Sequence, residues 1–389
     1  MVLDTFPSAE EFYKTYWGKK PFVVRGGIDK SEFDNFIDGD TLAGLSLEDD
    51  IKSRLVVTSE KGWVCEHGPF EEDRFSTLGD KNWSLLVQNI DQYHPNTSSL
   101  LRNFDFSPRW LMDDIMVSYS TVGGTVGPHT DSYHVFLVQG KGKRNWKVSH
   151  APILDGKCLA NQDLKVLEKS FDGQDVNVTM GDIIYIPPHF AHEGKTLEEA
   201  MTFSVGFLGP QLSEMFVEYG YYLEQNEQEN KRFVGQGIDT RSSTFLIGSD
   251  AVDMVKDSFS ASLQSDSFSA WMVKYFSTPT HDDIESMERR EHQMSEDEVS
   301  YKLEAGGVLR RDEQAKIAIT KSDDGILNLA VYGSVLHVSL EQETLVLWLN
   351  QKSPISIRDI KKWGHKKSLI QLVTELYNMN VLTFDCNDD

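Results

Sequence analysis

The first half of the chain alternates short apolar runs with glycine- and proline-rich turns. Runs of about four to eight residues that are rich in β-branched and aromatic side chains predict β-strands. The predicted strands cover residues 21–24, 55–57, 63–64, 83–89, 115–120, 127–138, 144–148, 176–179, 183–186 and 201–207. Gly140 and Gly142 predict a hairpin turn into the strand at 144–148. Because no regular alternation of strand and helix is seen, the pattern indicates a β-sandwich or a barrel.

The pattern changes after Pro210, where apolar residues recur at the spacing of an amphipathic helix. The first stripe comprises Leu212, Met215, Phe216, Tyr219, Tyr222 and Leu223. The second comprises Val252, Val255, Phe259 and Leu263, and a related face continues through Trp271, Met272 and Tyr275. These stripes are most simply helix-packing surfaces. Because a small helical segment has little core of its own, part of them is also a candidate dimer seam.

The C-terminal part begins with an acidic stretch. Residues 282–298 hold eight acids and two arginines, which indicates a linker or a solvated helix face. Beyond this stretch, the pattern predicts strands at 336–338 and 345–349, helices at 357–360 and 369–377, and a strand at 381–384. Two short helices followed by a strand are typical of a winged-helix-like module.

Composition narrows the class of protein. The length of 389 residues predicts two or three domains, and 39% hydrophobic residues suffice to build cores. Because no run of about 18 apolar residues and no signal-peptide pattern is seen, we expect a cytoplasmic protein without a membrane span. Cys65, Cys158 and Cys386 are scattered and odd in number, which argues against a disulfide framework or a zinc site. The net charge of −23 repels phosphate backbones and favours basic partners, although a solvated acidic surface without a partner carries the same charge.

The candidate chemistry is a metal site. His129 and Asp131 stand two residues apart at the start of a predicted strand, and residues i and i+2 of a strand point to the same face. His192 follows the apolar strand at 183–186 and offers a third ligand, with His189 as the competing choice. Two histidines and one carboxylate on one face form the facial triad of non-heme Fe(II) oxygenases.

Beyond this motif, the chain resembles the cupin-fold JmjC oxygenases, and specifically the bacterial ribosomal oxygenase group. The resemblance is strong over about the first 210 residues and weak beyond them. The segments that carry it are residues 12–25, 68–70, 83–88, 108–114, 126–129, 139–146 and 181–187.

The resemblance implies a mainly β fold of three parts. Residues 1–210 would form the double-stranded β-helix of a JmjC catalytic domain, also called a cupin or jelly roll. Residues 211–282 would form a helical dimerisation segment, and residues 283–389 a winged-helix-like C-terminal domain.

The resemblance also implies the site. His129, Asp131 and His192 would hold Fe(II), with His192 preferred over His189 because the family places this ligand in a His-x-Gly setting. The co-substrate 2-oxoglutarate and then O2 would take the open positions on the iron. Arg144 would bind the distal carboxylate with its guanidinium fork, since the predicted hairpin lets it face the same cavity, and Ser120 is a candidate hydroxyl partner. The alternative for the arginine is a surface charge, because three lysines surround it.

Three neighbouring residues are interpreted as structural. His134 stands where relatives often place an acid, and strand alternation points it away from His129 and Asp131. Trp146 and Phe136 are expected in the core rather than in contact with a substrate.

The implied activity is protein hydroxylation coupled to the oxidative decarboxylation of 2-oxoglutarate. The resemblance points to the β-carbon of an arginine in a basic large-subunit ribosomal protein of the uL16 type. It also implies a homodimer formed through the helical segment. The absence of a long apolar run and the net charge of −23 predict no membrane and no direct nucleic-acid partner. One alternative is an N-methyl-lysine demethylase that uses the same iron site. The other is a non-enzymatic cupin sensor whose C-terminal module binds nucleic acid, which only the basic cluster at 361–367 favours.

Overall fold

The computed structural model describes residues 2–60, 62–159, 164–226, 230–238, 245–279, 290–321, 325, 327–351 and 353–385. The chain divides into two compact units, Met1–Gly209 and Pro210–Asp389. The further boundary predicted at residue 282 lies outside the described residues, so the division into three domains stays a prediction. Cys386 also lies outside them. Across the described ranges, no helix is both long and apolar enough to cross a membrane.

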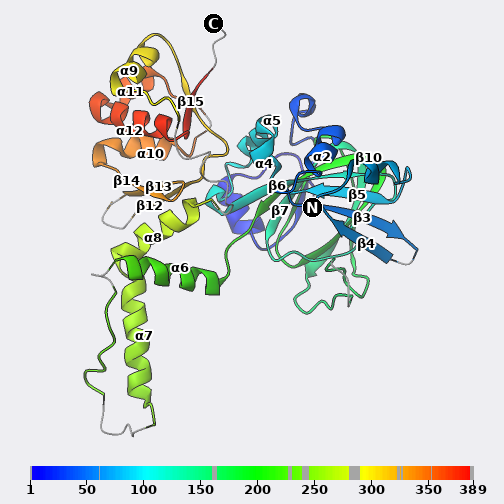
Figure 1. Cartoon of the computed structure of the whole chain (residues 1–389), viewed down its shortest axis with the longest axis horizontal. Helices are drawn as coiled ribbons and strands as arrows, with labels where there is room; N and C mark the ends of the chain where they lie inside the picture. Colours follow the sequence, from blue (N-terminus) through cyan, green and yellow to red (C-terminus); the bar gives the residue numbers. More distant parts are fainter. Residues whose placement is uncertain are drawn as a thin grey trace. The chain divides into compact units, whose positions relative to one another are not determined.

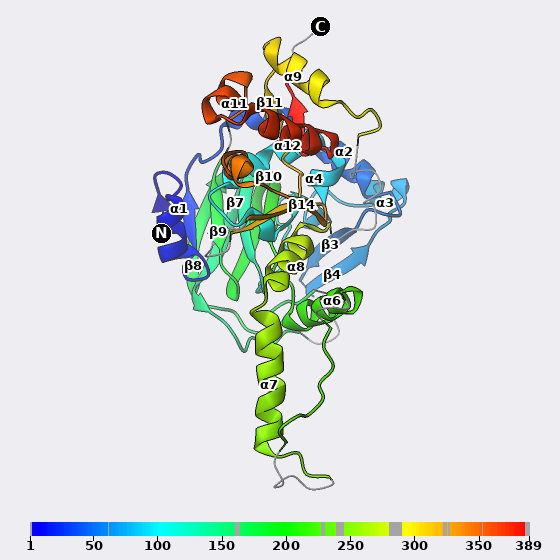
Figure 2. The same cartoon turned by 90° about the vertical axis from the view of Figure 1, so that its left-hand side faces the viewer.

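The first unit is built on one large sheet, as the apolar runs predict (Figures 1 and 2). Among the described residues its strands follow the order β1-β2-β9-β7-β10-β6-β5-β3-β4, with β8 paired to β7. The strands are β1 Val2–Leu3, β2 Phe22–Val24, β3 Ser53–Ser59, β4 Gly62–His67, β5 Trp83–Val87, β6 Met112–Ser120, β7 His134–Pro152, β8 Gly173–Thr179, β9 Ile183–Ile186 and β10 Phe190–Phe207. The pair β1–β2 is parallel and the other pairs are antiparallel.

The hairpin predicted at 140–143 is wrong, because β7 runs through these residues as one continuous strand. Gly140 and Gly142 do not reverse the chain but allow β7 to pack closely against β10. A Cβ atom at Gly140 would collide with the ring of Phe203, and one at Gly142 would collide with the backbone of Glu199. Gly142 also has a φ of +66°, and the pairing register shifts opposite it. Glycine inside a strand marks such a bulge or close approach as often as a turn.

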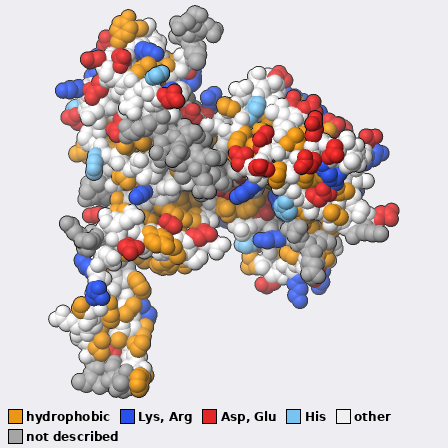
Figure 3. Space-filling view, in the orientation of Figure 1, with side chains coloured by type: hydrophobic (Ala, Val, Ile, Leu, Met, Phe, Trp, Pro, Cys, Tyr) orange, Lys and Arg blue, Asp and Glu red, His pale blue; other side chains and the backbone are white. Residues whose placement is uncertain are grey.

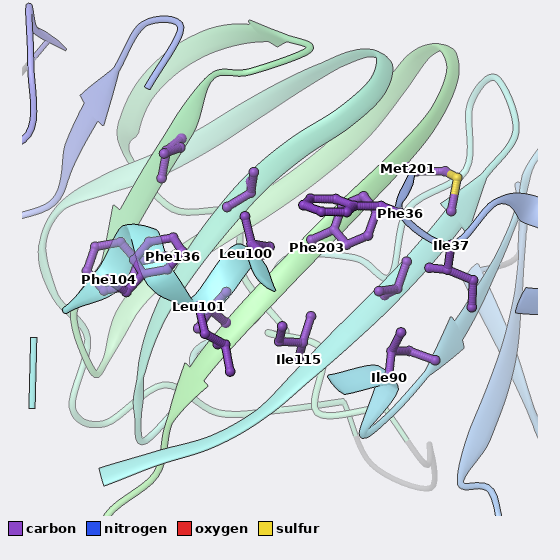
Figure 4. Close-up of a cluster of buried hydrophobic side chains, with 14 of the residues drawn as sticks. Phe36, Ile37, Ile90, Leu100, Leu101, Phe104, Ile115, Phe136, Met201 and Phe203 are labelled. Atoms are coloured by element: carbon purple, nitrogen blue, oxygen red, sulfur yellow. The ribbon is translucent and has the colours of Figure 1, made fainter. Parts of the chain in front are cut away.

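Short helices of the first unit cover the sheet and contribute to its core. They are α1 Ala9–Glu11, the π-helical turn Phe12–Tyr16, the 3-10 turns Lys30–Asn35, Ser99–Phe104 and Arg109–Leu111, and helices α2 Gly39–Leu45, α3 Glu72–Ser76, α4 Ile90–Tyr93 and α5 Pro95–Ser98. In the core, Phe104 packs on Phe136 of β7 with ring centroids 4.8 Å apart (Figure 4). Phe136 is fully buried, as expected of a core residue.

His134 begins β7 and lies in an aromatic stack. Its ring lies parallel to that of Trp17, with centroids 3.5 Å apart. Its Nδ1 is 2.8 Å from the hydroxyl of Tyr185, which also accepts a hydrogen bond from the backbone N–H of Gly18. A neutral imidazole accepts the tyrosine proton at Nδ1. Burial lowers the pKa of His134 to about 4, which keeps the ring neutral in this stack.

Replacing His134 with phenylalanine tests this description. At pH 8 we expect the free energy of unfolding to fall by about 1 kcal/mol, because the bond to Tyr185 is lost while the stacking remains. Since the pKa of His134 is about 4 in the folded state and 6.5 in its reference state, the unfolded wild type takes up the proton first as pH falls between these values. The wild type therefore loses stability relative to His134→Phe over this window. Urea denaturation of both proteins between pH 8 and 4 measures the difference, and a constant difference would contradict the assignment.

The second unit contains helices and two small sheets. The helices are α6 Leu212–Gln225, α7 Ser249–Leu263, α8 Asp266–Ser277, α9 Glu296–Glu304, α10 Glu343–Trp348, α11 Ile357–Trp363 and α12 Lys366–Asn378, with a 3-10 turn at Leu340–Gln342. The strands are β11 Leu309–Arg311, β12 Ile317–Lys321, β13 Leu327–Val331, β14 Ser334–His337 and β15 Leu382–Phe384. Strands β12, β13 and β14 form an antiparallel sheet, and β11 pairs with β15.

The strand predicted at 345–349 is wrong, because these residues lie in and just after helix α10. Leu345, Val346 and Trp348 are buried in a core shared with α9, α11 and α12. A short run of consecutive apolar residues has no periodicity that separates a buried strand from a buried helix. The helices predicted at 357–360 and 369–377 are confirmed as parts of α11 and α12, and the strand at 381–384 corresponds to β15.

Candidate metal and co-substrate site

His129, Asp131 and His192 come together in the first unit. One potential ligand atom from each residue lies within 4.8 Å of the other two. The Nε2 atoms of His192 and His129 lie 3.4 Å and 4.0 Å from Oδ2 of Asp131. Two ligands bound at right angles to one ion, each at about 2.1 Å, are about 3 Å apart. The cluster therefore needs little closure to hold one divalent ion.

The backbone brings the two histidines side by side. His129 and His192 form an isolated antiparallel bridge and exchange two hydrogen bonds, of 3.0 Å and 2.9 Å. The strand predicted to start at 127 begins only at His134, so His129 and Asp131 lie in the preceding loop. The side chains converge as expected, but the cause is this bridge to β10 rather than alternation along one strand.

Hydrogen bonds to main-chain carbonyls orient the two imidazoles. Nδ1 of His129 is 2.9 Å from the carbonyl of Gly127, and Nδ1 of His192 is 3.0 Å from the carbonyl of Phe190. Because a carbonyl only accepts, both Nδ1 atoms carry the proton and both Nε2 atoms are left with a lone pair for a metal. Burial lowers the pKa of His192 to about 4, and the neighbouring His129 acts in the same direction. His192 is therefore neutral and ready to bind a metal near pH 7.

His189, the competing ligand, is not part of the cluster. Its backbone adopts a φ of +66° and its N–H donates to the carbonyl of Asp131 over 2.7 Å. Its own carbonyl accepts from the N–H of Ile153. His189 thus supports the loop that carries Asp131 through its main chain.

The cluster opens into a cavity of about 590 Å³. Its wall includes Arg144 and Trp146 of β7, Thr202 of β10 and Ser84 of β5. The acids Asp113 and Asp114 of β6 and the bases Lys52, Arg54 and Lys165 also line it. This volume suits a small dicarboxylate together with one long side chain of a substrate.

Arg144 is a buried cation without an acidic partner among the described residues. Its side chain is only 4% exposed and donates to Oγ1 of Thr202 over 3.1 Å and to the carbonyl of Gly194 over 3.5 Å. Desolvation lowers its pKa to about 10, so the guanidinium stays charged at pH 7. A buried unpaired charge is costly unless an anion joins it. Arg144 is therefore well placed to receive a carboxylate in the cavity.

Ser120 is not among the residues that line the cavity. Its buried Oγ lies 2.6 Å from that of Ser84 and accepts a hydrogen bond of 2.8 Å from Oγ1 of Thr196. Ser84, which does line the cavity, and Thr202, which contacts Arg144, were missed in the sequence. Thr202 and Ser204 alternate with apolar residues on β10, and this alternation is the signal that marks a polar cavity face.

Comparisons with known proteins agree with this architecture. The JmjC domain family matches residues 99–215. The ribosomal protein uL16 3-hydroxylase of Escherichia coli is 36% identical over 276 residues, which cover 70% of this chain and 72% of that protein. The probable ribosomal oxygenase of Haemophilus influenzae is 38% identical over 208 residues, covering 53% of this chain and 51% of that protein.

Solved structures extend the similarity to nearly the whole chain. A crystal structure of Escherichia coli YcfD has a TM-score of 0.77 and 30% identity, and covers 97% of this chain and 98% of that one. The structure of YcfD, a ribosomal oxygenase, in complex with cobalt and 2-oxoglutarate has a TM-score of 0.75, 30% identity and the same coverage.

The sheet and the domain match define a protein of the JmjC-type, cupin-like class. The identity and coverage of the relatives narrow this class further. The chain belongs to the bacterial ribosomal oxygenase family, as the sequence resemblance predicts.

Proposed function

We propose that this protein is an Fe(II)- and 2-oxoglutarate-dependent hydroxylase that acts on the β-carbon of an arginine in a ribosomal protein of the uL16 type. The observation that carries the proposal is the 36% identity to the uL16 3-hydroxylase over 72% of that protein. A basic ribosomal protein also suits the net charge of −23. Such a substrate would place the enzyme in the cytoplasm.

Each site residue has a defined role in this proposal. His129 and His192, both neutral, and ionised Asp131 would hold Fe(II), while Arg144 would bind the distal carboxylate of 2-oxoglutarate. The bound metal, with 2-oxoglutarate and O2, supplies the oxidant for hydroxylation of a C–H bond. The chain itself positions the target carbon and keeps water from the site. Ser120 would act through Ser84, which lines the cavity and whose Oγ lies 2.6 Å from that of Ser120.

The cavity offers carboxylates to a cationic substrate side chain, beside the bases Lys52, Arg54 and Lys165. Asp113 and Asp114 line the cavity together with Asp131 and Tyr133. Burial raises the pKa of Tyr133, and the negative charge of these acids acts in the same direction, so its hydroxyl stays protonated and can donate a hydrogen bond. A guanidinium that enters this cavity meets carboxylates and a phenol, which are its preferred partners.

Mass spectrometry of ribosomal proteins from cells with and without this gene tests the substrate. We expect one arginine-bearing peptide of a uL16-type protein to lose the mass of one oxygen atom when the gene is absent. Expression of the wild type should restore it, and expression of His129→Ala should not. Identical spectra from both strains would refute the ribosomal substrate, and a change in lysine methylation instead would favour demethylation.

We further propose that residues 211–282 form a dimerisation segment. The described part of this segment exposes large apolar side chains on α6 and α7 (Figure 3). They are Leu212, Phe216, Val217 and Tyr221 on α6 and Val252, Val255, Phe259 and Leu263 on α7. A monomer rarely leaves so many neighbouring apolar side chains in water, so a second copy of the chain is the natural cover.

Charge placed in this surface should separate the subunits. Phe259, which is 63% exposed, would be replaced with glutamate, and the neighbouring exposed Ser258 with glutamate as a matched control. We expect Phe259→Glu to weaken dimerisation by about tenfold or more, since a charge would be buried without a partner, and Ser258→Glu to change it little. Sedimentation velocity over a concentration series measures both. A wild-type protein that stays monomeric at high concentration would contradict the proposal.

We also propose that residues 283–389 form a winged-helix-like domain. Helices α9, α11 and α12 share one core with α10, and β13 and β14 form an adjacent hairpin, as expected of a wing. Its basic cluster is partly neutralised, because Lys366 pairs with Glu304 and His365 lies 3.3 Å from Glu341. We therefore propose no nucleic-acid binding for this domain.

A further inference from the structure

We propose that Trp146 is a positioning residue, whose indole face holds the Arg144 guanidinium where the distal carboxylate of 2-oxoglutarate binds. This inference rests on the co-substrate role proposed for Arg144. It goes beyond it by assigning a function to a tryptophan that the sequence marks only as a core residue.

The two side chains share one face of β7. Arg144 and Trp146 are separated by one residue, and both line the cavity. The central carbon of the guanidinium lies 5.0 Å from the indole ring, which is within the range of a cation–π contact. The indole centroid lies 6.0 Å from that of His192, so Trp146 stands close to both the arginine and the metal cluster.

Arg144 needs an additional contact to stay in place. Within the described part of the chain, it donates hydrogen bonds only to the hydroxyl of Thr202 and, at 3.5 Å, to the carbonyl of Gly194, both of which are neutral. Holding a long side chain with several rotatable bonds in one orientation costs conformational entropy. Two hydrogen bonds to neutral groups offset little of this cost. The aromatic face supplies attraction without neutralising the charge. The full positive charge is thus kept for the incoming carboxylate.

The indole is itself held from behind by β10. Gly194 pairs directly with Trp146, and a Cβ atom at position 194 would lie 2.7 Å from the ring. The glycine therefore lets the ring lie against the backbone of β10. The buried Nε1 of Trp146 has no hydrogen-bond partner in the described part of the chain. An orientation that leaves this donor unsatisfied costs stability, which fits a ring placed for the arginine.

Equilibrium binding of 2-oxoglutarate to the Co(II)-loaded full-length protein, measured by calorimetry, tests the proposal. We expect Trp146→Phe to raise the dissociation constant about threefold and Trp146→Leu about tenfold or more, in line with the strength of cation–π contacts. Co(II) affinity should stay within about threefold of wild type, because no metal ligand is changed. Trp83→Leu, which removes a tryptophan outside the cavity, is the matched control and should bind 2-oxoglutarate normally.

Two further measurements separate positioning from general loss of packing. Binding of 2-oxovalerate, a keto acid of equal length without the distal carboxylate, should be unaffected by Trp146→Leu. In a double-mutant cycle, Trp146→Leu should have no further effect when Arg144 is already methionine. Unchanged 2-oxoglutarate affinity in folded Trp146→Leu, or equal weakening of both keto acids, would overturn the role of Trp146. A wild type that does not bind 2-oxoglutarate at all would instead refute the proposed function.

Discussion

Replacing His192 with alanine is expected to abolish metal binding and to lower 2-oxoglutarate turnover by about a thousandfold or more, which corresponds to about 4 kcal/mol of transition-state stabilisation. The reason is geometric, because Nε2 of His192 lies 3.4 Å from Oδ2 of Asp131, closer to it than the 4.0 Å of His129. His192 is also buried and neutral, and among the described residues only His129 and Asp131 join it in the cluster. Co(II) titration followed by absorbance, together with succinate production, measures both effects.

His189→Asn is the matched control for this prediction. Asparagine tolerates the left-handed backbone of residue 189 and keeps the N–H that donates to Asp131. We expect this variant to bind Co(II) within about threefold of wild type and to remain active. If His189→Asn lost the metal while His192→Ala kept it, the ligand assignment would have to be reversed.

Replacing Arg144 with methionine is expected to raise the dissociation constant for 2-oxoglutarate by about a hundredfold, because charge-assisted bonds to a carboxylate are lost. The same change should raise the free energy of unfolding without 2-oxoglutarate by about 1 kcal/mol. Arg144 is buried without an acidic partner among the described residues, so an apolar side chain of similar length removes a desolvation penalty. Calorimetry and urea denaturation measure the two quantities. Weaker binding of 2-oxoglutarate together with a higher free energy of unfolding is the outcome that distinguishes this prediction.

Arg25→Met provides the comparison. Arg25 pairs with Asp182 over 2.7 Å and bonds the carbonyl of Asn177, and it does not line the cavity. We expect this variant to lose stability, because the buried carboxylate of Asp182 loses its charged partner, and to bind 2-oxoglutarate normally. Weakened 2-oxoglutarate binding in Arg25→Met to the same extent would show that the effect at Arg144 is not local.

Strands buried on both faces were readable in the sequence. The runs at 183–186 and 201–207 correspond to β9 and to the end of β10, where nearly every residue is buried. The predictions of secondary structure are wrong where the same short sequence pattern is compatible with two different structures. Gly140 and Gly142 read as a turn but allow β10 to approach, and the apolar run at 345–349 reads as a strand but packs as a helix. In both cases neighbours distant in sequence decide the outcome.

The site was predicted in part. The types and spacing of His129, Asp131 and His192 indicated a metal cluster, and the structure brings these three side chains together. The sequence could not show that Ser120 is turned towards Ser84 and Thr196, or that Arg144 rests on Trp146. Such contacts depend on strand register, and a shift of one residue reverses the face that every side chain occupies.

The strand-rich first half, the change to helices after Pro210 and the three residues able to hold a metal can all be predicted from the amino-acid sequence alone. These features follow from local periodicity and from side-chain chemistry, which the chain carries at every position. Contacts between distant segments are needed to show that a bridge between His129 and His192 aligns two ligands, and that Arg144 is buried beside an aromatic face with no acidic partner among the described residues. Pairing between distant strands sets register and burial, and no local pattern specifies either.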